Sequence, residues 1–180
     1  MTDEEIYLMY LGAWLHDIGN IVDREEHHIH SMIFIEKSPI IESQLGMTTK
    51  HQLEWLVKAH SSKCNIMDVP VDHDRSRLRF ISAIFRIADA CEINNTKCPM
   101  EVYQLIEETM PQENKIYWEA HRSILGIVFN SPKILFYVND KEKSEILTSH
   151  VVEEISSVKK VLSSYKVKVP KVKVIVTKPY

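Results

Sequence analysis

The chain is poor in the residues and segments that mark secreted, membrane-spanning and cysteine-rich metal proteins. It holds only three cysteines, Cys64, Cys91 and Cys98, with no C-x-x-C pair among them. Such cysteines indicate reduced thiols rather than a disulfide framework or a cysteine zinc site. No apolar run reaches the length of a membrane span, and no basic segment followed by an apolar one forms a leader. These absences predict a cytoplasmic protein that does not enter a membrane.

Strong net charge is also absent. The formal net charge is −3, which argues against wholesale nucleic-acid binding. The charge is uneven, because Glu154 is the last acidic residue and every charged side chain after it is a lysine. Lys171 and Lys173 alternate with valines there, a pattern typical of an edge strand whose lysines prevent edge-to-edge pairing. Contact with a phosphate backbone is the alternative. We therefore expect nucleic acid not to be a partner.

The order of the predicted elements indicates a mainly α fold. A chain of 180 residues can bury a sizeable core as one domain with an appendage. Helical patterns cover residues 3–17, 26–37, 39–45, 50–61, 74–94 and 99–109. Pro111-Gln112-Glu113-Asn114 breaks this pattern, and strands at 123–129 and 134–138, a helix at 144–164 and a strand at 171–177 follow. The sequence predicts a helical bundle over residues 1–110 and a small ββαβ module over residues 111–180 packed on it.

His16 and Asp17 stand at the end of the first predicted helix. This helix begins with the capping box of Thr2 and Glu5, ends at Gly19 as a left-handed stop, and is apolar on every side, so we expect it to be buried. A buried carboxylate is costly unless it is hydrogen-bonded, ion-paired or bound to a cation. The alternative is a histidine near the helix dipole with a solvated aspartate.

Three more helices carry a candidate metal ligand. His27 shares a face with Ser31, and His60 lies on the inward side of the helix over residues 50–61. Asp89 ends the one polar stripe of an otherwise apolar helix: Arg79, Ser82, Arg86 and Asp89. Taken singly, the stripe could be a solvent face and His60 a hydrogen-bonded core histidine. Taken together, these side chains favour a metal-centred helical bundle.

The order of these residues resembles the HD-domain superfamily of metal-dependent phosphohydrolases. The matching segments are LGAWLHDIGN, REEHHIHS, LVKAHS and FRIADACEI. Arg24, His27 and Ser31 stand in the family's R-x-x-H-x-x-x-S register. The chain is most similar to HD domains of prokaryotic multidomain proteins, some of which are fused to Hsp90-type ATPases. The resemblance covers roughly residues 3–98.

The resemblance implies hydrolysis of a phosphomonoester or phosphodiester bond in a nucleotide or a related small molecule. The implied cofactor is one or two divalent ions, among Mn, Fe, Co, Ni, Zn and Mg, and the implied ligands are His16, Asp17, His27, His60 and Asp89. Asp17 would touch both ions. Arg24 and Arg86 are the implied phosphate contacts, with a salt bridge that orients a ligand carboxylate as the alternative for Arg86.

The chain departs from the family pattern near its first motif. Members usually carry a metal-binding histidine upstream of the His-Asp pair, and none precedes His16. The chain is then either a piece of a longer domain or one that has lost this ligand, unless His30 or His51 replaces it. Ser61 follows His60 where the family often has a second histidine. These departures keep a second hypothesis open: a degenerate HD module that binds a nucleotide or protein partner as a sensor. Fusion to other domains and assembly with further copies also stay open.

Overall fold

The computed structural model of the chain describes residues 1–177, and residues 178–180 of the predicted C-terminal module lie outside it. The described residues form two compact units. The first contains Met1–Asp89 and Lys160–Tyr165, and the second contains Ala90–Lys159 and the segment that begins at Lys166. The predicted domain division at residue 110 stays a prediction. Within residues 1–177, no helix is both long and apolar enough to cross a membrane.

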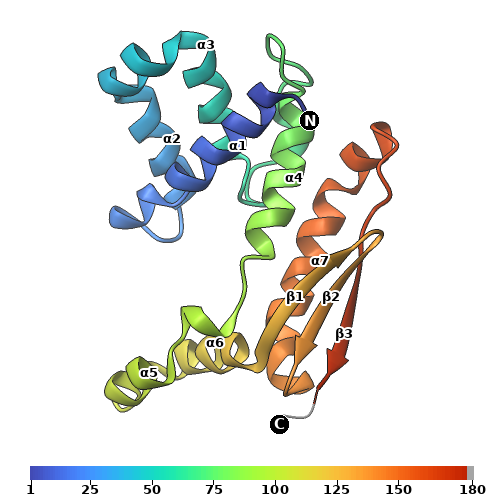
Figure 1. Ribbon diagram of the computed structural model, residues 1–180. Helices are drawn as coiled ribbons and strands as arrows, with labels where there is room; N and C mark the ends of the chain where they lie inside the picture. The colour runs from blue at the N-terminus through green and yellow to red at the C-terminus, as the bar shows by residue number, and fades with distance from the viewer. Residues whose placement is uncertain (178–180) are drawn as a thin grey trace. The chain divides into compact units, whose positions relative to one another are not determined.

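The first unit is a bundle of helices around an apolar core. Its elements are α1 (Asp3–Leu15), η1 (Ile18–Ile21), α2 (His27–Lys37), α3 (Pro39–Lys58), η2 (Ile66–Asp68) and α4 (Leu78–Ala90). Figure 1 shows α3 with α1 and α2, both of which pack against it, and α2 also contacts η1. The core contains fully buried side chains from α2, α3 and α4: Ile35, Leu53, Leu56, Leu78 and Ile81. This packing brings the ends of α1 and α3 to the start of α2.

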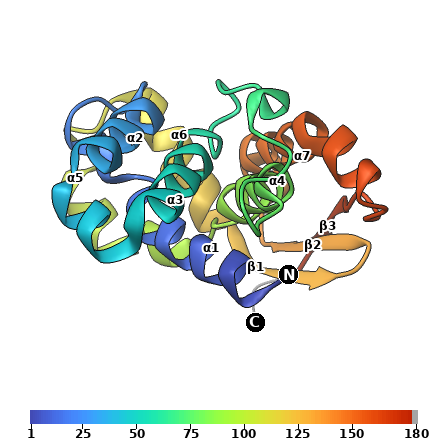
Figure 2. The same ribbon diagram turned by 90° about the horizontal axis from the view of Figure 1, so that it is seen from above.

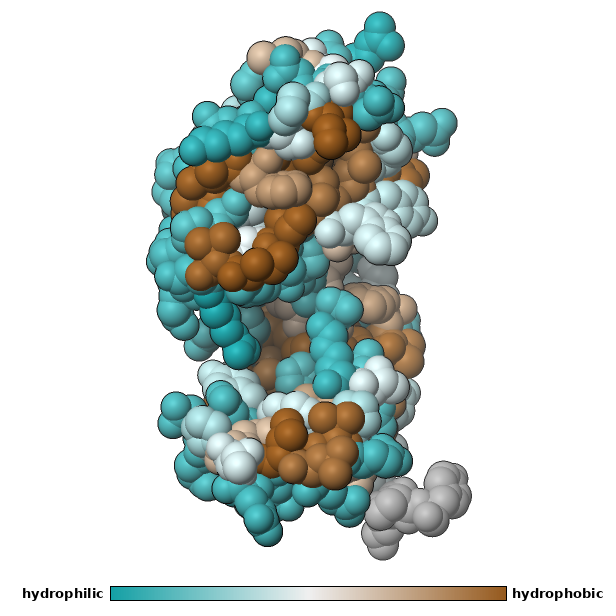
Figure 3. Space-filling model, turned by 90° about the vertical axis from the view of Figure 1, so that its left-hand side faces the viewer, coloured by the Kyte–Doolittle hydropathy of each residue, from teal (hydrophilic) through white to brown (hydrophobic). Residues whose placement is uncertain are grey.

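The first helix is less buried than its composition predicts. Only Glu5, Leu8 and Gly12 of α1 are buried, whereas Tyr10 is 67% and Trp14 is 85% exposed. The expectation of a fully buried helix is therefore wrong, because α1 packs through one narrow stripe only. Figure 3 shows patches of hydrophobic side chains on the face of the molecule turned toward the viewer. Exposed apolar patches of this kind occur where no other element packs against an apolar surface.

Two glycines set local geometry that the sequence pattern did not reveal. The chain continues from α1 into η1, and Gly19 is not in the left-handed region, so its prediction as a helix stop is wrong. The positive φ belongs instead to Gly46, at 77°, where α3 kinks. The two helices predicted over residues 39–45 and 50–61 are joined across this kink. The capping box is confirmed, since Thr2 Oγ1 accepts from the Glu5 amide and Glu5 Oε2 accepts from the Thr2 amide.

The second unit combines helices with a small sheet. Its elements are η3 (Asn95–Lys97), α5 (Met100–Ile106), α6 (Gln112–Ser123), β1 (Ile124–Asn130), β2 (Lys133–Val138), α7 (Lys141–Ser164) and β3 (Lys171–Val176), except that α7 from Lys160 onward belongs to the first unit. β1 pairs antiparallel with β2, and β2 pairs parallel with β3. Figures 1 and 2 show α7 running along one face of this sheet. The predicted mainly α fold with a ββαβ module is confirmed. The predicted break at Pro111 is confirmed as the end of the preceding helical pattern, since α5 ends at Ile106. Gln112 to Asn114 begin α6, however, and the sequence did not predict this helix.

Candidate metal centre

Three side chains from three helix ends form one cluster of donors. Asp17 follows α1, His27 begins α2 and His60 follows α3, and one ligand atom from each lies within 4.8 Å of the others. The Nε2 atoms of His27 and His60 are 2.9 Å apart. Asp17 Oδ1 lies 3.4 Å from His27 Nε2 and 3.9 Å from His60 Nε2. The structure thus brings together side chains that are 43 residues apart in the sequence.

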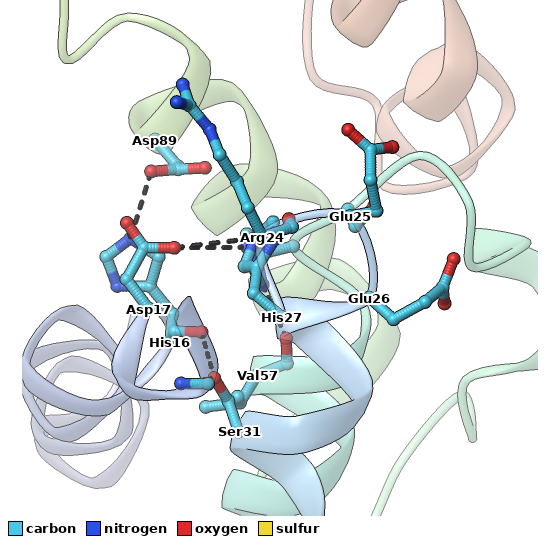
Figure 4. A network of polar contacts seen from close by, with 12 residues as sticks. His16, Asp17, Arg24, Glu25, Glu26, His27, Ser31, Val57 and Asp89 are labelled. Atoms are coloured by element: carbon cyan, nitrogen blue, oxygen red, sulfur yellow. Dashed lines mark hydrogen bonds and ion pairs between the residues drawn. The ribbon is translucent and has the colours of Figure 1, made fainter. Parts of the chain in front are cut away.

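A second donor set shares Asp17 with the first. His16 Nε2 lies 3.2 Å from Asp89 Oδ1 of α4 and 3.5 Å from Asp17 Oδ2. The two oxygens of Asp17 therefore face different histidines, Oδ1 toward His27 and Oδ2 toward His16 (Figure 4). A carboxylate placed in this way can contact two cations at once. All five predicted ligands lie in these two sets.

The ring nitrogens of the histidines are oriented by backbone carbonyl groups. Nδ1 lies 3.1 Å from Ala13 O in His16, 2.7 Å from Arg24 O in His27 and 2.5 Å from Val57 O in His60. A carbonyl oxygen only accepts, so each Nδ1 carries a hydrogen and each neutral ring presents the lone pair of Nε2 to the cluster. A hydrogen bond from the other ring nitrogen to a carbonyl group is typical of metal-ligating histidines.

The close approach of His27 to His60 needs a positive charge between the rings. Two Nε2 lone pairs at 2.9 Å repel unless a proton or a cation lies between them. Adjacent donors around an ion bonded at about 2.1 Å are separated by about 3 Å. The donor set and its spacing therefore fit a divalent metal ion.

The electrostatics of the buried His60 and the half-buried His16 also fit a cation site. Burial lowers the pKa of His60 to about 4, so this ring is neutral near pH 7 and able to act as a ligand. Burial also lowers the pKa of His16, but the carboxylates of Asp89 and Asp17 outweigh it and the net shift is upward. The upward shift means that the two carboxylates favour positive charge at the His16 ring itself.

Comparison with known families places the chain among HD-type proteins. A model of the family described as HD-CE matches residues 50–156, more than half of the chain. The chain belongs to the HD-CE family. The matched span of this HD-CE protein includes His60 and Asp89, whereas His16, Asp17 and His27 precede it. The predicted resemblance to an HD-domain family is thereby confirmed. A search of curated proteins finds no match to the chain.

A buried serine fixes the turn that carries Asp17 in this HD-CE chain. Ser31 Oγ donates to His16 O at 2.6 Å and accepts from the Gly19 amide at 2.8 Å. The turn lies so close to α2 that a Cβ on Gly19 would be 2.1 Å from His27 O. The R-x-x-H-x-x-x-S register thus joins a candidate ligand, His27, to the residue that holds the His-Asp turn against α2.

The two predicted phosphate contacts have different surroundings. Arg86 is only 1% exposed, and its guanidinium donates to the carbonyl oxygens of Ala59, Ser61 and Cys64 at 2.6 to 2.9 Å. It therefore holds the chain on both sides of His60, which favours a positioning role over direct phosphate contact. Arg24 is exposed, and its side chain makes no hydrogen bond or ion pair within residues 1–177. Figure 4 shows it beside the cluster, on the loop before α2.

Sequence reasoning missed two neighbours of the cluster. Lys63 donates to Glu25 O at 2.6 Å and to Glu26 Oε1 at 3.0 Å, which ties the loop after His60 to the loop before α2. No sequence pattern signals this contact. Phe85 packs edge-on against the His16 ring, with the centroids 5.6 Å apart. Its position four residues before Asp89 on α4 could have indicated that it faces the cluster.

The two spare histidines do not join the described cluster. His51 lies on α3 and contacts Glu54 at 3.0 Å. His30 lies on α2 and is not a member of the donor cluster found in residues 1–177. Neither replaces a ligand in this arrangement.

Proposed function

We propose that this HD-CE protein is a metal-dependent phosphohydrolase that cleaves a phosphomonoester or phosphodiester bond of a nucleotide or a related small molecule. The observation that carries the proposal is the pair of donor sets that share Asp17, one with His27 and His60 and the other with His16 and Asp89. Membership of an HD-type family supports the same reaction class.

The donor set also suggests which ion it would hold. Mixed imidazole and carboxylate donors suit Mn, Fe, Co, Ni or Zn better than Ca, and Mg stays a candidate. A divalent ion bound there supplies a nucleophilic water near neutral pH and neutralises charge on the phosphoryl oxygens. Asp17 would belong to both donor sets, with Oδ1 facing His27 and Oδ2 facing His16.

The arginines would have separate roles in this reaction. Arg24 has an exposed guanidinium without a partner in residues 1–177, so it is free to donate to two phosphoryl oxygens. Arg86 would act as a positioning residue, because it holds the carbonyl groups around His60 and is buried. The exposed Arg24 would thus bind substrate and the buried Arg86 would keep a ligand in place.

Metal content tests the first half of the proposal. We expect the purified chain to retain Mn after dialysis, measured by mass spectrometry of the metal, and the Asp17→Ala variant to lose it most completely. Asp68→Ala is the matched control, since Asp68 is exposed and lies outside both donor sets. Metal content in Asp17→Ala equal to that of the parent chain would contradict the shared-carboxylate geometry.

Turnover tests the second half. A panel of mono- and dinucleotides is incubated with the chain and Mn, and products are read by phosphate release and chromatography. We expect hydrolysis of one class that stops with chelator and in the His16→Ala and Asp89→Ala variants, while the control His51→Ala stays active. Tight binding of a nucleotide that remains intact would overturn the proposal in favour of a sensor.

A further inference from the structure

The second unit contains an open apolar groove that the proposed reaction does not use. It lies between α7 and the strand β3 and has a volume of about 400 Å³. Thr148 and Val152 of α7 line one side, together with the charged side chains of Lys141, Glu145 and Glu153, and Val172 and Val174 of β3 line the other. Val152 is 46% exposed and the two β3 valines are only half-buried. A groove of this size is within the range of ligand-binding clefts.

One wall of the groove is a free edge of the sheet. β3 is the last strand in the order β1-β2-β3, and it pairs through one edge with β2. Within residues 1–177, no strand pairs with its outer edge. An unpaired edge presents a row of N–H and C=O groups that an extended segment can bind. Here the edge and the groove lie side by side on the same strand.

The lysines of β3 occupy the face of the sheet opposite the groove. Lys173 pairs in register with Leu135, and Val174 pairs with Phe136, which is buried on the α7 side. Because side chains alternate along a strand, Lys171 and Lys173 point away from the groove. Both are exposed, and neither has an ion pair within residues 1–177.

These lysines select the kind of strand that can pair with β3. A second copy of β3 would bring lysines close to lysines across the new ladder, and like charges opposite one another are destabilising. Carboxylates in the same positions would be stabilising. The lysines therefore disfavour pairing of β3 with a second copy of β3 and favour pairing with a strand that carries carboxylates.

From these observations we infer that the α7–β3 groove binds an extended, acidic segment of another protein. The segment adds to the outer edge of β3 as a further strand. Its apolar side chains enter the groove between Val152 and Val174, and its alternate side chains are carboxylates that face Lys171 and Lys173. Main-chain hydrogen bonds supply affinity, while the alternation supplies specificity. The site is independent of the metal centre, since none of the donor residues belongs to the groove.

Fluorescence anisotropy with short labelled peptides tests the charge selection. The probe alternates valine and glutamate, and its control alternates valine and lysine. We expect the full chain to bind the acidic probe at least ten-fold more tightly than the basic one. The double variant Lys171→Glu with Lys173→Glu should reverse this preference. Lys159→Glu with Lys160→Glu carries the same change of charge on α7, outside the groove, and should leave it unchanged.

Backbone pairing is tested with methylated probes. Alternate N–H groups of an added strand face β3, so a probe methylated on every valine nitrogen and one methylated on every glutamate nitrogen should differ, with only one losing affinity by at least ten-fold. Circular dichroism checks that each protein variant is folded. Absence of saturable binding of the acidic probe, an unchanged preference in the Lys171→Glu/Lys173→Glu variant, or equal binding of both methylated probes would each overturn the inference.

Discussion

Gly19 occupies a position where a methyl group meets backbone on α2. A Cβ there would lie 2.1 Å from His27 O and 2.6 Å from the Ser31 amide nitrogen, and neither atom can move without shifting α2. We expect Gly19→Ala to destabilise the chain by about 2 kcal/mol or more, as over-packing of a rigid site does. Because the displaced segment carries Asp17 and His27, retained Mn should fall as well. Urea unfolding and metal analysis measure the two effects.

Gly126 provides the matched control for this change. A Cβ added at Gly126 meets nothing within 4 Å, so Gly126→Ala tests the loss of a glycine without a clash. Its unfolding midpoint and its Mn content should equal those of the parent chain. Equal stability of the Gly19→Ala and Gly126→Ala variants would show that the turn is not held against α2 as described.

At the scale of elements, Arg86 joins α4 to the segment that carries His60. Arg86→Met removes the donors to Ala59, Ser61 and Cys64 and leaves buried carbonyl groups without a partner. We expect a loss of about 3 kcal/mol or more in the free energy of unfolding. Metal affinity should fall by about 10- to 100-fold, as happens when a group that orients a ligand is lost.

Arg79 is the control on the same helix. Its guanidinium also donates to carbonyl oxygens, those of Met67 and Val69, but these lie away from both donor sets. Arg79→Met should therefore lower stability and leave the affinity for Mn unchanged. If both variants lost metal equally, Arg86 would have no specific positioning role. Isothermal titration with Mn separates these outcomes.

The start of α1 is tied to the residues before α4 by a buried ion pair. Glu5 is fully buried and accepts from Arg77 Nε at 2.8 Å and Nη2 at 2.6 Å. The hydrogen bonds from Arg77 lower the pKa of Glu5 from 4.5 to about 2. A carboxyl with a lowered folded-state pKa stabilises the fold above its unfolded pKa, and this contribution is lost as the pH falls from 4.5 through about 2.

The Glu5→Gln variant tests this pH dependence. At about 1.4 kcal/mol per pKa unit, the contribution is at most about 3 kcal/mol, and solvent near the partly exposed Arg77 reduces it. We expect the difference in unfolding free energy between the parent chain and Glu5→Gln to shrink as the pH falls from 5 toward about 2. Glu4 lies on the exposed side of the same helix turn, so the unfolding free energy of Glu4→Gln should change with pH as that of the parent chain does. A constant difference for Glu5→Gln would contradict the assigned ion pair.

The sequence predicted the helices and strands better than it predicted which of their faces are covered by other elements. Hydrophobic periodicity located α2, α4, α7 and the strands, because a repeating apolar face has a period that residue order reveals. The same signal could not show that Trp14 is exposed, since an apolar residue does not record whether another element lies against it. The whole of α6 was missed, because Pro111 and the polar residues after it resemble a loop as well as a helix start.

The residues of the candidate site were readable for a similar reason. Histidine and aspartate are chemically unusual at the ends of apolar helices, and the structure brings together all five: His16, Asp17, His27, His60 and Asp89. The expectation that Asp17 is buried is wrong, because its side chain follows α1 and is 57% exposed. Their supports were harder to find. The partners of Arg86 are backbone carbonyl groups, which every residue carries, so no side-chain pattern points to them. The role of Lys63 likewise depends on two loops meeting in space.

At the scale of the whole molecule, metal binding should stabilise the two units unequally. Every donor of the candidate centre belongs to the first unit, which contains Met1–Asp89 and Lys160–Tyr165. A ligand at about 100 times its dissociation constant stabilises the state that binds it by about 2.7 kcal/mol. If the units open separately, that energy slows amide exchange about 100-fold in the first unit only.

Hydrogen exchange with and without Mn measures this difference peptide by peptide, and α5 (Met100–Ile106) is the decisive segment. The sequence places it before the predicted domain division at residue 110, whereas in the structure it belongs to the second unit. We expect slowed exchange in α2 and α3 and unchanged exchange in α5 and in β1 to β3. The Asp17→Ala variant, which lacks the shared donor, should show no slowing anywhere. Slowing in α5 but not in the sheet would put the boundary at residue 110, and equal slowing throughout would mean that the chain opens as one cooperative unit.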